Sequence, residues 1–215
     1  MTRILAISDE VDDALYGDKL YALRPDLIVA CGDLPFEYLE NLVSRTDVPL
    51  LFMTYLNPIL AFGIERFCRA ASDAGIDGLI VPDLPPTEST ELRRAAEACQ
   101  IDLVFFVAPT STEAGIAAAC GAATGFIYCI AVTGVTGARA QLDPALLPLI
   151  QTVRRHTSLP IVVGFGISRP EHLAALQGRA DGVIVASALL DAIAESPDDP
   201  TSRVREFLTG IRPPL

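Results

Sequence analysis

The chain has 215 residues, of which 51% are hydrophobic and 20% are charged, and its formal net charge at pH 7 is −11. This length and composition fit one globular domain with a hydrophobic core. The negative charge argues against binding to nucleic acid or to an anionic membrane surface. Because lysine is nearly absent, a phosphorylated ligand would have to be bound mainly by backbone N–H groups.

The N-terminal sequence MTRILAISDEVDD is a short apolar run followed by acidic residues. Such a segment is neither a signal peptide nor a membrane span, so we expect a cytoplasmic protein. The five cysteines have irregular spacings and form no C-x-x-C pair. They are therefore predicted to be reduced residues in or near the core.

Short apolar segments recur along the whole chain, each long enough for one strand and rich in Val, Ile and Phe. Segments that are apolar on both faces are typical of a parallel sheet covered on both sides. The segments between them have helical patterns, and Thr110–Glu113 and Ser168–Glu171 match the capping box that starts a helix. His156 and His172 fall in these helical segments and are predicted to lie on the surface. The eight predicted strands are 4–8, 27–32, 49–55, 78–83, 102–109, 125–132, 160–166 and 182–188.

Eight strand–helix units predict a minimal (β/α)8 TIM barrel with eight parallel strands. A doubly wound open sheet is the alternative, but that fold usually has fewer strands. No proline-rich or glycine-rich linker divides the chain, so residues 1–215 are predicted to form a single barrel. The functional groups of such a barrel lie at the carboxyl ends of the strands.

Six motifs after residue 48 resemble the α subunit of tryptophan synthase, in the order found in that family. They are FMTYLNPIL, GLIVPDLPP, FVAPTST, GFIYCIAVTGVTGAR, VVGFGIS and ADGVIVASAL. The resemblance implies a (β/α)8 barrel that cleaves indole-3-glycerol phosphate, by a retro-aldol reaction, to indole and glyceraldehyde 3-phosphate. It also implies that the barrel has no metal or cofactor of its own and that a pyridoxal-phosphate-dependent β subunit is its partner.

The resemblance implies two groups of site residues at the barrel mouth. Small residues let backbone N–H groups approach a phosphate, and a helix N-terminus at Ser187 favours an anion. Ala186 departs from the Gly-Ser that the family usually has, and alanine disfavours a positive φ. The implied phosphate site is Gly137, Phe165, Gly166, Ala186 and Ser187, and the implied indole pocket is Tyr55, Ile80, Tyr128 and Thr136.

Residues 1–48 resemble instead the start of a calcineurin-like metallophosphoesterase, through the motifs ISDEVD and CGDL. Asp9 and Asp33 match the first two aspartates of that family. Val11 replaces its histidine and its third motif is missing, so no metal site is predicted. We therefore expect a hybrid chain, with residues 1–48 of phosphoesterase-like origin and residues 49–215 like the α subunit.

The second strand decides the expected activity. The α-subunit family reads D-L-I-E-L-G there, and its Glu is the principal acid–base residue, whereas this chain has DLIVACG with Val29 in that place. We therefore predict a hybrid barrel that binds phosphate or a phosphorylated small molecule, lacks activity and has lost docking to the β subunit. One alternative is an active lyase in which Asp33, Glu10 or Asp83 replaces the lost acids. The second alternative is a metal-dependent phosphoesterase that uses Asp9 and Asp33.

Overall fold

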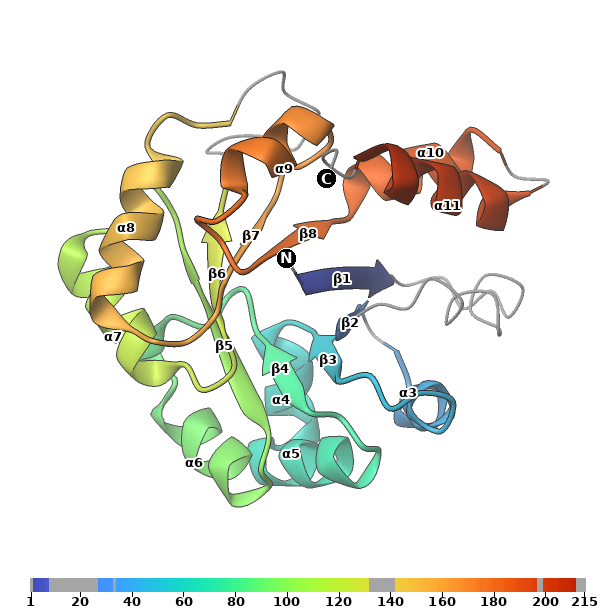
Figure 1. The fold of residues 1–215 in the computed structure, drawn as a ribbon. Helices are drawn as coiled ribbons and strands as arrows, with labels where there is room; N and C mark the ends of the chain where they lie inside the picture. The colour runs from blue at the N-terminus through green and yellow to red at the C-terminus, as the bar shows by residue number, and fades with distance from the viewer. Residues whose placement is uncertain (1, 8–26, 33, 132–141, 197–198, 212–215) are drawn as a thin grey trace.

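The computed structural model describes residues 2–7, 27–32, 34–131, 142–196 and 199–211. In it, eight parallel strands form a closed barrel in chain order, in which β1 pairs with both β8 and β2 (Figure 1). The predicted TIM barrel is confirmed, and the open sheet is ruled out. That residues 1–215 form a single domain stays a prediction. The strands are β1 (Thr2–Ile7), β2 (Leu27–Cys31), β3 (Leu50–Met53), β4 (Gly78–Ile80), β5 (Asp102–Val107), β6 (Ile127–Ile130), β7 (Ile161–Gly164) and β8 (Gly182–Val185).

Helices lie around the outside of the barrel (Figure 1). None of the helices in the described ranges is long and apolar enough to cross a membrane. The helices are α3 (Phe36–Val43), α4 (Leu56–Phe62), α5 (Ile64–Asp73), the 3-10 helix η1 (Pro86–Glu88), α6 (Thr90–Ala98), α7 (Glu113–Ala122), α8 (Leu146–His156), α9 (Pro170–Leu176), α10 (Ser187–Ala194) and α11 (Pro200–Ile211).

The strands bury apolar side chains on both faces, because successive residues of a strand point to opposite sides. One set packs outward against the helices, for example Ile28, Phe52 and Val163. The other set fills the barrel and is called the inner cluster below. The inner cluster consists of Val29, Leu51, Ile80, Val104, Phe126, Tyr128, Val162 and Ile184, with Leu27, Cys31, Met53 and Phe106 packed against it.

None of the five cysteines forms a disulfide within the described part of the chain, as predicted, and all are at least partly buried. The predicted helix starts are less accurate. Helix α7 begins at Glu113, and the N-cap is Thr112, whose Oγ1 accepts a hydrogen bond from the Gly115 N–H at 3.1 Å. The capping box predicted at Thr110 is therefore two residues early.

Helix α9 begins one residue later than predicted, after Arg169, because Pro170 occupies the first helical turn. The prediction that His172 lies on the surface is wrong, since only 3% of it is exposed. It lies on the buried face of α9 with Leu173 and Leu176. Its Nδ1 accepts a hydrogen bond from the Ser168 N–H at 3.3 Å.

A carboxylate joins three elements at the amino ends of β7 and β8. Asp181 Oδ2 accepts hydrogen bonds from the Ile161 N–H at 2.7 Å and from Arg154 Nη2, on α8, at 2.6 Å. Burial alone would raise the pKa of the Asp181 carboxyl, but these two hydrogen bonds together with the positive charge of Arg154 outweigh it and hold the pKa below its ordinary value. Asp181 therefore stabilises the fold while it is ionised.

Replacing Asp181 by asparagine keeps an oxygen acceptor but removes the charge. The pKa of Asp181 is lower in the folded protein than in the unfolded chain. The carboxylate therefore stabilises the fold fully above its unfolded-state pKa, and this stabilisation is lost as the pH falls through the unfolded-state and then the folded-state pKa. We expect Asp181→Asn to lower stability at pH 7 by roughly 0.2–1 kcal/mol, and the difference to shrink below about pH 4. Thermal unfolding followed by circular dichroism from pH 7 to pH 3 measures this. Asp191→Asn, on the exposed side of α10, is the control, and a gap that widens at low pH would contradict the assignment.

Candidate active site

Three aromatic rings form a cluster, called the mouth cluster below: Phe106 near the carboxyl end of β5, Tyr128 within β6 and Phe165 just after β7. The ring centroids of Phe106 and Tyr128 are 4.7 Å apart, those of Tyr128 and Phe165 are 5.5 Å apart, and those of Phe106 and Phe165 are 6.3 Å apart. Tyr128 is 5% exposed, whereas Phe165 is 41% exposed. The mouth cluster therefore runs from the barrel interior to the surface and offers ring faces to a flat apolar ligand.

Tyr128 fits over the last residue of β7. A Cβ atom at Gly164 would lie 2.0 Å from the Tyr128 hydroxyl oxygen, so only glycine leaves room for this tyrosine. Burial raises the pKa of the Tyr128 hydroxyl, and the nearby Cys31 thiol raises it further. The hydroxyl therefore keeps its proton at neutral pH and can donate a hydrogen bond.

The turn after β7 has a strained backbone. Phe165 has a φ of +64° and Gly166 has a φ of +80°. A left-handed conformation at a phenylalanine costs about 1–2 kcal/mol, and such residues concentrate where a turn serves a ligand site. The turn follows β7, next to β8 in the barrel.

Ala186 and Ser187 lie at the start of α10. Ala186 is the N-cap with a φ of −117°, so this position does not need the left-handed conformation that alanine disfavours. Its carbonyl oxygen accepts hydrogen bonds from the N–H groups of Leu189 at 2.9 Å and Leu190 at 3.0 Å. The N–H groups of the first helical turn have no acceptor inside a helix, so this end of α10 can receive an anion.

The structure brings together two of the residues predicted for the indole pocket. Ile80 is fully buried and Tyr128 nearly so, and both belong to the inner cluster. Tyr55 is 63% exposed and belongs to neither apolar set. Four predicted or candidate residues, Asp9, Asp33, Thr136 and Gly137, lie outside the described residues, as does Glu10. Within the described ranges, no three His, Cys, Asp or Glu side chains are grouped so that they could hold a metal ion.

Asp83 and Val29 bear on the predicted chemistry. Asp83 is exposed after β4, and its Oδ1 accepts a hydrogen bond from the Leu56 N–H, the first residue of α4, at 2.9 Å. This carboxylate therefore caps α4 rather than lying in the barrel. Val29 is 2% exposed and points into the inner cluster, where it contributes packing only.

Phe106 and Gly164 were missed in the sequence, although a signal for each was present. Period-two alternation in the strand DLVFFV puts Phe106 on the same face as Val104, and Val104 is an inner-cluster residue. Gly164 ends an otherwise branched strand, IVVG, and a glycine in a strand often marks a close approach by another group.

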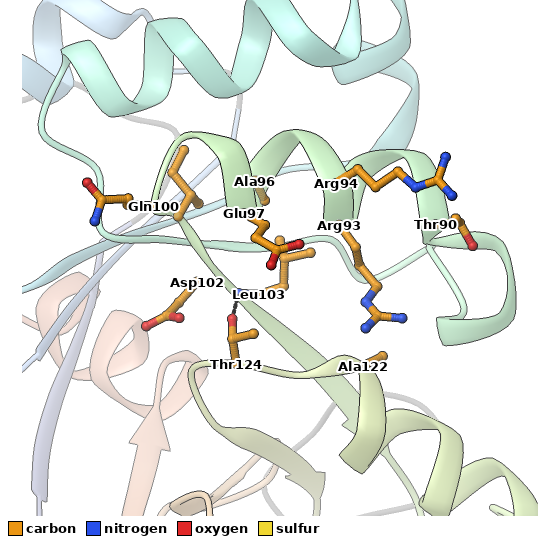
Figure 2. A pocket seen from close by; sticks show the side chains of 11 residues that line it. Thr90, Arg93, Arg94, Ala96, Glu97, Gln100, Asp102, Leu103, Ala122 and Thr124 are labelled. Atoms are coloured by element: carbon orange, nitrogen blue, oxygen red, sulfur yellow. Dashed lines mark hydrogen bonds between the residues drawn. The ribbon is translucent and has the colours of Figure 1, made fainter.

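A surface cleft of about 560 Å³ lies at the other end of the barrel. It is bounded by α6 and by the segments that lead into β5 and β6, with Arg93, Glu97 and Asp102 among its lining side chains (Figure 2). In Figure 2 the Leu103 N–H donates a hydrogen bond to Thr124 Oγ1, at 2.9 Å, across the floor of the cleft. Active sites of (β/α)8 barrels lie at the carboxyl ends of the strands, so the mouth cluster is the better candidate site.

Comparison with protein families gives one match that extends over most of the chain. The family model described as tryptophan synthase alpha chain matches residues 33–212. The chain belongs to the tryptophan synthase alpha chain family. The resemblance seen in the six motifs is thereby confirmed and extends further towards the N-terminus than those motifs do.

Curated relatives agree with this assignment. The tryptophan synthase alpha chain of Chloroflexus aurantiacus is 46% identical over 180 residues, which cover 81% of this chain and 68% of the relative. That of Roseiflexus castenholzii is 47% identical over 165 residues, which cover 76% of this chain and 63% of the relative. The chain thus matches about two thirds of the length of these tryptophan synthase alpha chains.

Solved structures extend the likeness in fold to nearly the whole chain. A tryptophan synthase structure from Mycobacterium tuberculosis matches with a TM-score of 0.82 at 30% identity, over 97% of this chain and 91% of that one. A tryptophan synthase complex from Pyrococcus furiosus matches with a TM-score of 0.85, over 98% of this chain and 97% of that one. Its 23% identity shows the fold alone.

These findings correct the prediction of an inactive hybrid. The family match starts at residue 33, inside the segment attributed to a phosphoesterase, and the relatives are named tryptophan synthase alpha chain. The solved tryptophan synthase structures also cover the first two strands. Neither a phosphoesterase segment nor a chimera is supported by these matches.

The predicted loss of docking to a β subunit has no support either. It depended on the first two strand–helix units being foreign to the family. The matching fold of a tryptophan synthase complex includes counterparts of those units.

Proposed function

We propose that this chain is a lyase that cleaves indole-3-glycerol phosphate to indole and glyceraldehyde 3-phosphate, the reaction that its resemblance to the α subunit of tryptophan synthase implies. The family match over residues 33–212 carries the proposal. Relatives that are 46% and 47% identical and bear the name tryptophan synthase alpha chain support it.

The mouth cluster is the proposed binding place of the indole ring. Phe106 and Tyr128 lie inside the barrel mouth and Phe165 lies at its edge, so an aromatic ring can stack against them. Aromatic pairs of this kind contribute about 0.5–1.5 kcal/mol beyond the burial of their area. Ile80 and the other apolar side chains of the inner cluster form the floor. Tyr55 and Thr136 remain predicted pocket residues.

The phosphate group is proposed to bind beside the mouth cluster, between the turn after β7 and the start of α10. The donors would be backbone N–H groups of Phe165, Gly166, Ala186 and Ser187, with Gly137 as a further predicted contributor. The left-handed turn at 165–166 and the N-terminus of α10 support this placement. The substrate would then lie with its ring on the aromatic side chains and its phosphate over β7 and β8.

Indole release tests the proposed activity. The purified chain is incubated with indole-3-glycerol phosphate, and indole is separated and identified by its absorbance and mass. We expect indole and glyceraldehyde 3-phosphate in equal amounts, at a rate proportional to the protein concentration. Release that stays at the level of the protein-free reaction at every protein concentration would refute the proposal.

We further propose that a tryptophan synthase β chain docks on α4. Tyr55, the N-cap residue of α4, is 63% exposed, and Leu60, on α4, is 52% exposed. These apolar groups lie just after β3, beside the barrel mouth, where a second subunit could take up released indole. Large apolar side chains exposed to this extent are candidates for an interaction surface.

Leu60→Asp is expected to weaken this complex at least about tenfold, because it buries a charge in an apolar interface. The matched control is Leu190→Asp, since Leu190 is equally exposed, at 50%, but lies on α10. Mixing each variant with a tryptophan synthase β chain in analytical ultracentrifugation measures the effect. Equal weakening by both substitutions would argue against α4 as the docking surface.

A further inference from the structure

His172 is a polar side chain on a helix face that otherwise packs into the core. Only 3% of it is exposed, and its neighbours on the buried face of α9 are Leu173 and Leu176. An apolar side chain is the usual occupant of such a position, because burying a polar group is costly unless the group is hydrogen-bonded. The imidazole is therefore expected to do something that an apolar side chain could not.

Within the described ranges the imidazole makes a single hydrogen bond, through Nδ1. This atom accepts from the Ser168 N–H at 3.3 Å, so the neutral ring carries its proton on Nε2. Nε2 is buried and has no hydrogen-bond partner in the part of the chain that the structure describes. A buried donor without a partner opposes folding, so stability alone does not explain a histidine here. What the imidazole contributes is the bond to Ser168.

Ser168 ends the turn that is proposed to bind the phosphate. Phe165 and Gly166 have φ angles of +64° and +80° in this turn. A left-handed phenylalanine is unfavourable by itself and persists only where the surrounding structure holds it. Ile167, which is 2% exposed, anchors the turn in the outward-facing core. The bond from Ser168 to His172 then fixes the backbone two residues after Gly166.

The start of α9 has no ordinary side-chain cap. Its N-cap residue is Arg169, whose side chain forms no capping hydrogen bond, and the Ser168 Oγ is buried without a partner among the described residues. His172 is the third residue of the helix and binds back to the N–H that precedes the N-cap, much as the third residue of a capping box does. It therefore ties the turn to the body of α9.

We propose that His172 is a positioning residue for the substrate phosphate. By accepting the Ser168 N–H, its Nδ1 holds Phe165 and Gly166 in the left-handed conformation that binds the phosphate. This inference rests on the proposed lyase function and on its phosphate site. His172 does not touch the substrate in this role, so its loss weakens binding and leaves the bond-breaking step almost unchanged.

Steady-state kinetics of His172→Leu and His172→Asn with indole-3-glycerol phosphate test the proposal. Leucine fills the space without an acceptor, whereas asparagine offers its Oδ1 in the place of Nδ1. We expect His172→Leu to raise KM about three- to tenfold, as the net contribution of one hydrogen bond implies. Its kcat should stay within about twofold of the wild-type value. His172→Asn should bring KM back to within about twofold of the wild type.

Thermal unfolding separates positioning from packing. Leucine also removes the unpartnered Nε2 donor, so His172→Leu should not melt markedly below the wild type although its KM is raised. Should His172→Leu fail to fold, His172→Met takes its place, because methionine adapts to irregular space in a core. An equal rise of KM in the apolar variant and in His172→Asn would make His172 a packing residue and would overturn the proposal.

His156→Leu is the matched control. His156 is the other histidine of the chain and ends α8, before the amino end of β7, whereas the turn follows the carboxyl end of β7. Its Nε2 lies 3.7 Å from Glu113 Oε1. This variant should keep KM within about twofold of the wild type. A rise as large as that of His172→Leu would show that the effect does not come from the turn, and the proposal would fall.

Inorganic phosphate gives a readout that does not need turnover. Amide signals of Phe165, Gly166 and Ser168 are followed by NMR during a phosphate titration, and we expect the Kd to rise in His172→Leu and to return in His172→Asn. If the wild type releases no indole, the lyase function falls and the Kd values alone decide on His172. If indole is released but KM and Kd are the same in His172→Leu as in the wild type, only the role of His172 falls. Absence of phosphate-dependent shifts at the turn in the wild type would overturn both the phosphate site and the role of His172.

Discussion

Replacing Gly164 by alanine is expected to lower the free energy of unfolding by about 1–3 kcal/mol and to reduce indole release at the same time. The new methyl carbon would lie 2.0 Å from the Tyr128 hydroxyl oxygen and about as close to the ring. The ring cannot simply move aside, because Phe106 and Phe165 flank it with centroids 4.7 Å and 5.5 Å away. The whole mouth cluster must therefore shift, and the proposed indole pocket with it.

A second substitution, at Tyr128, tests whether the contact between residue 164 and Tyr128 causes the loss of stability in Gly164→Ala. Tyr128→Leu removes the hydroxyl and the outer ring carbons, so Gly164→Ala should cost much less stability in that background. A double-mutant cycle measured by urea unfolding gives the coupling energy. Gly121→Ala is the control, because nothing lies within 4 Å of a Cβ at that helical glycine, and the helix should gain slightly. Full additivity of Gly164→Ala and Tyr128→Leu would show that the two residues do not compete for space.

Gly166→Asp is expected to raise KM for indole-3-glycerol phosphate at least about 100-fold, with a smaller effect on stability. Gly166 has a φ of +80° in the turn proposed to bind phosphate, and a carboxylate there would repel the substrate dianion at short range. A like charge facing a phosphate without water between them costs a few kcal/mol, and about 2.7 kcal/mol corresponds to 100-fold. Initial rates over a range of substrate concentrations separate KM from kcat.

The control for this charge is Gly178→Asp. Gly178 also has a positive φ, +72°, with open space around its Cβ position, but it lies in the turn after α9. Both variants carry the same backbone strain and the same added charge. The proposed phosphate site predicts a large rise in KM only for Gly166→Asp, and similar KM values in the two variants would place the phosphate elsewhere.

Much of the fold could be predicted from local sequence. Segments such as LIVAC and IVVG are apolar at every position, and such segments are stable only where both faces of a strand are covered. Eight of them, separated by helical patterns, leave few arrangements other than a closed barrel. Helix starts were less predictable, since Thr110 and Thr112 can both cap and only the path of the chain selects Thr112.

The function, like the fold, could be predicted from the sequence only in part. The motifs from residue 49 onward indicated the family, because each combines small residues, prolines and aromatics that packing alone does not require. The first two strands were misjudged, because a single sequence does not show which substitutions its family accepts at a given position. Val29 in place of a glutamate was taken as loss of activity, although the family model and the curated relatives place the chain in the family.

By itself, the sequence determined the number and order of the strands, the family motifs and the dependence on backbone donors for a phosphate. These follow from residue type and local periodicity. Only the tertiary structure decided that Tyr128 fits over Gly164 and that His172 is buried. Such contacts join residues that are far apart in the chain, and they are set by the packing of neighbouring strands and helices, as where β6 lies beside β7. No local pattern specifies which side chains then share the mouth.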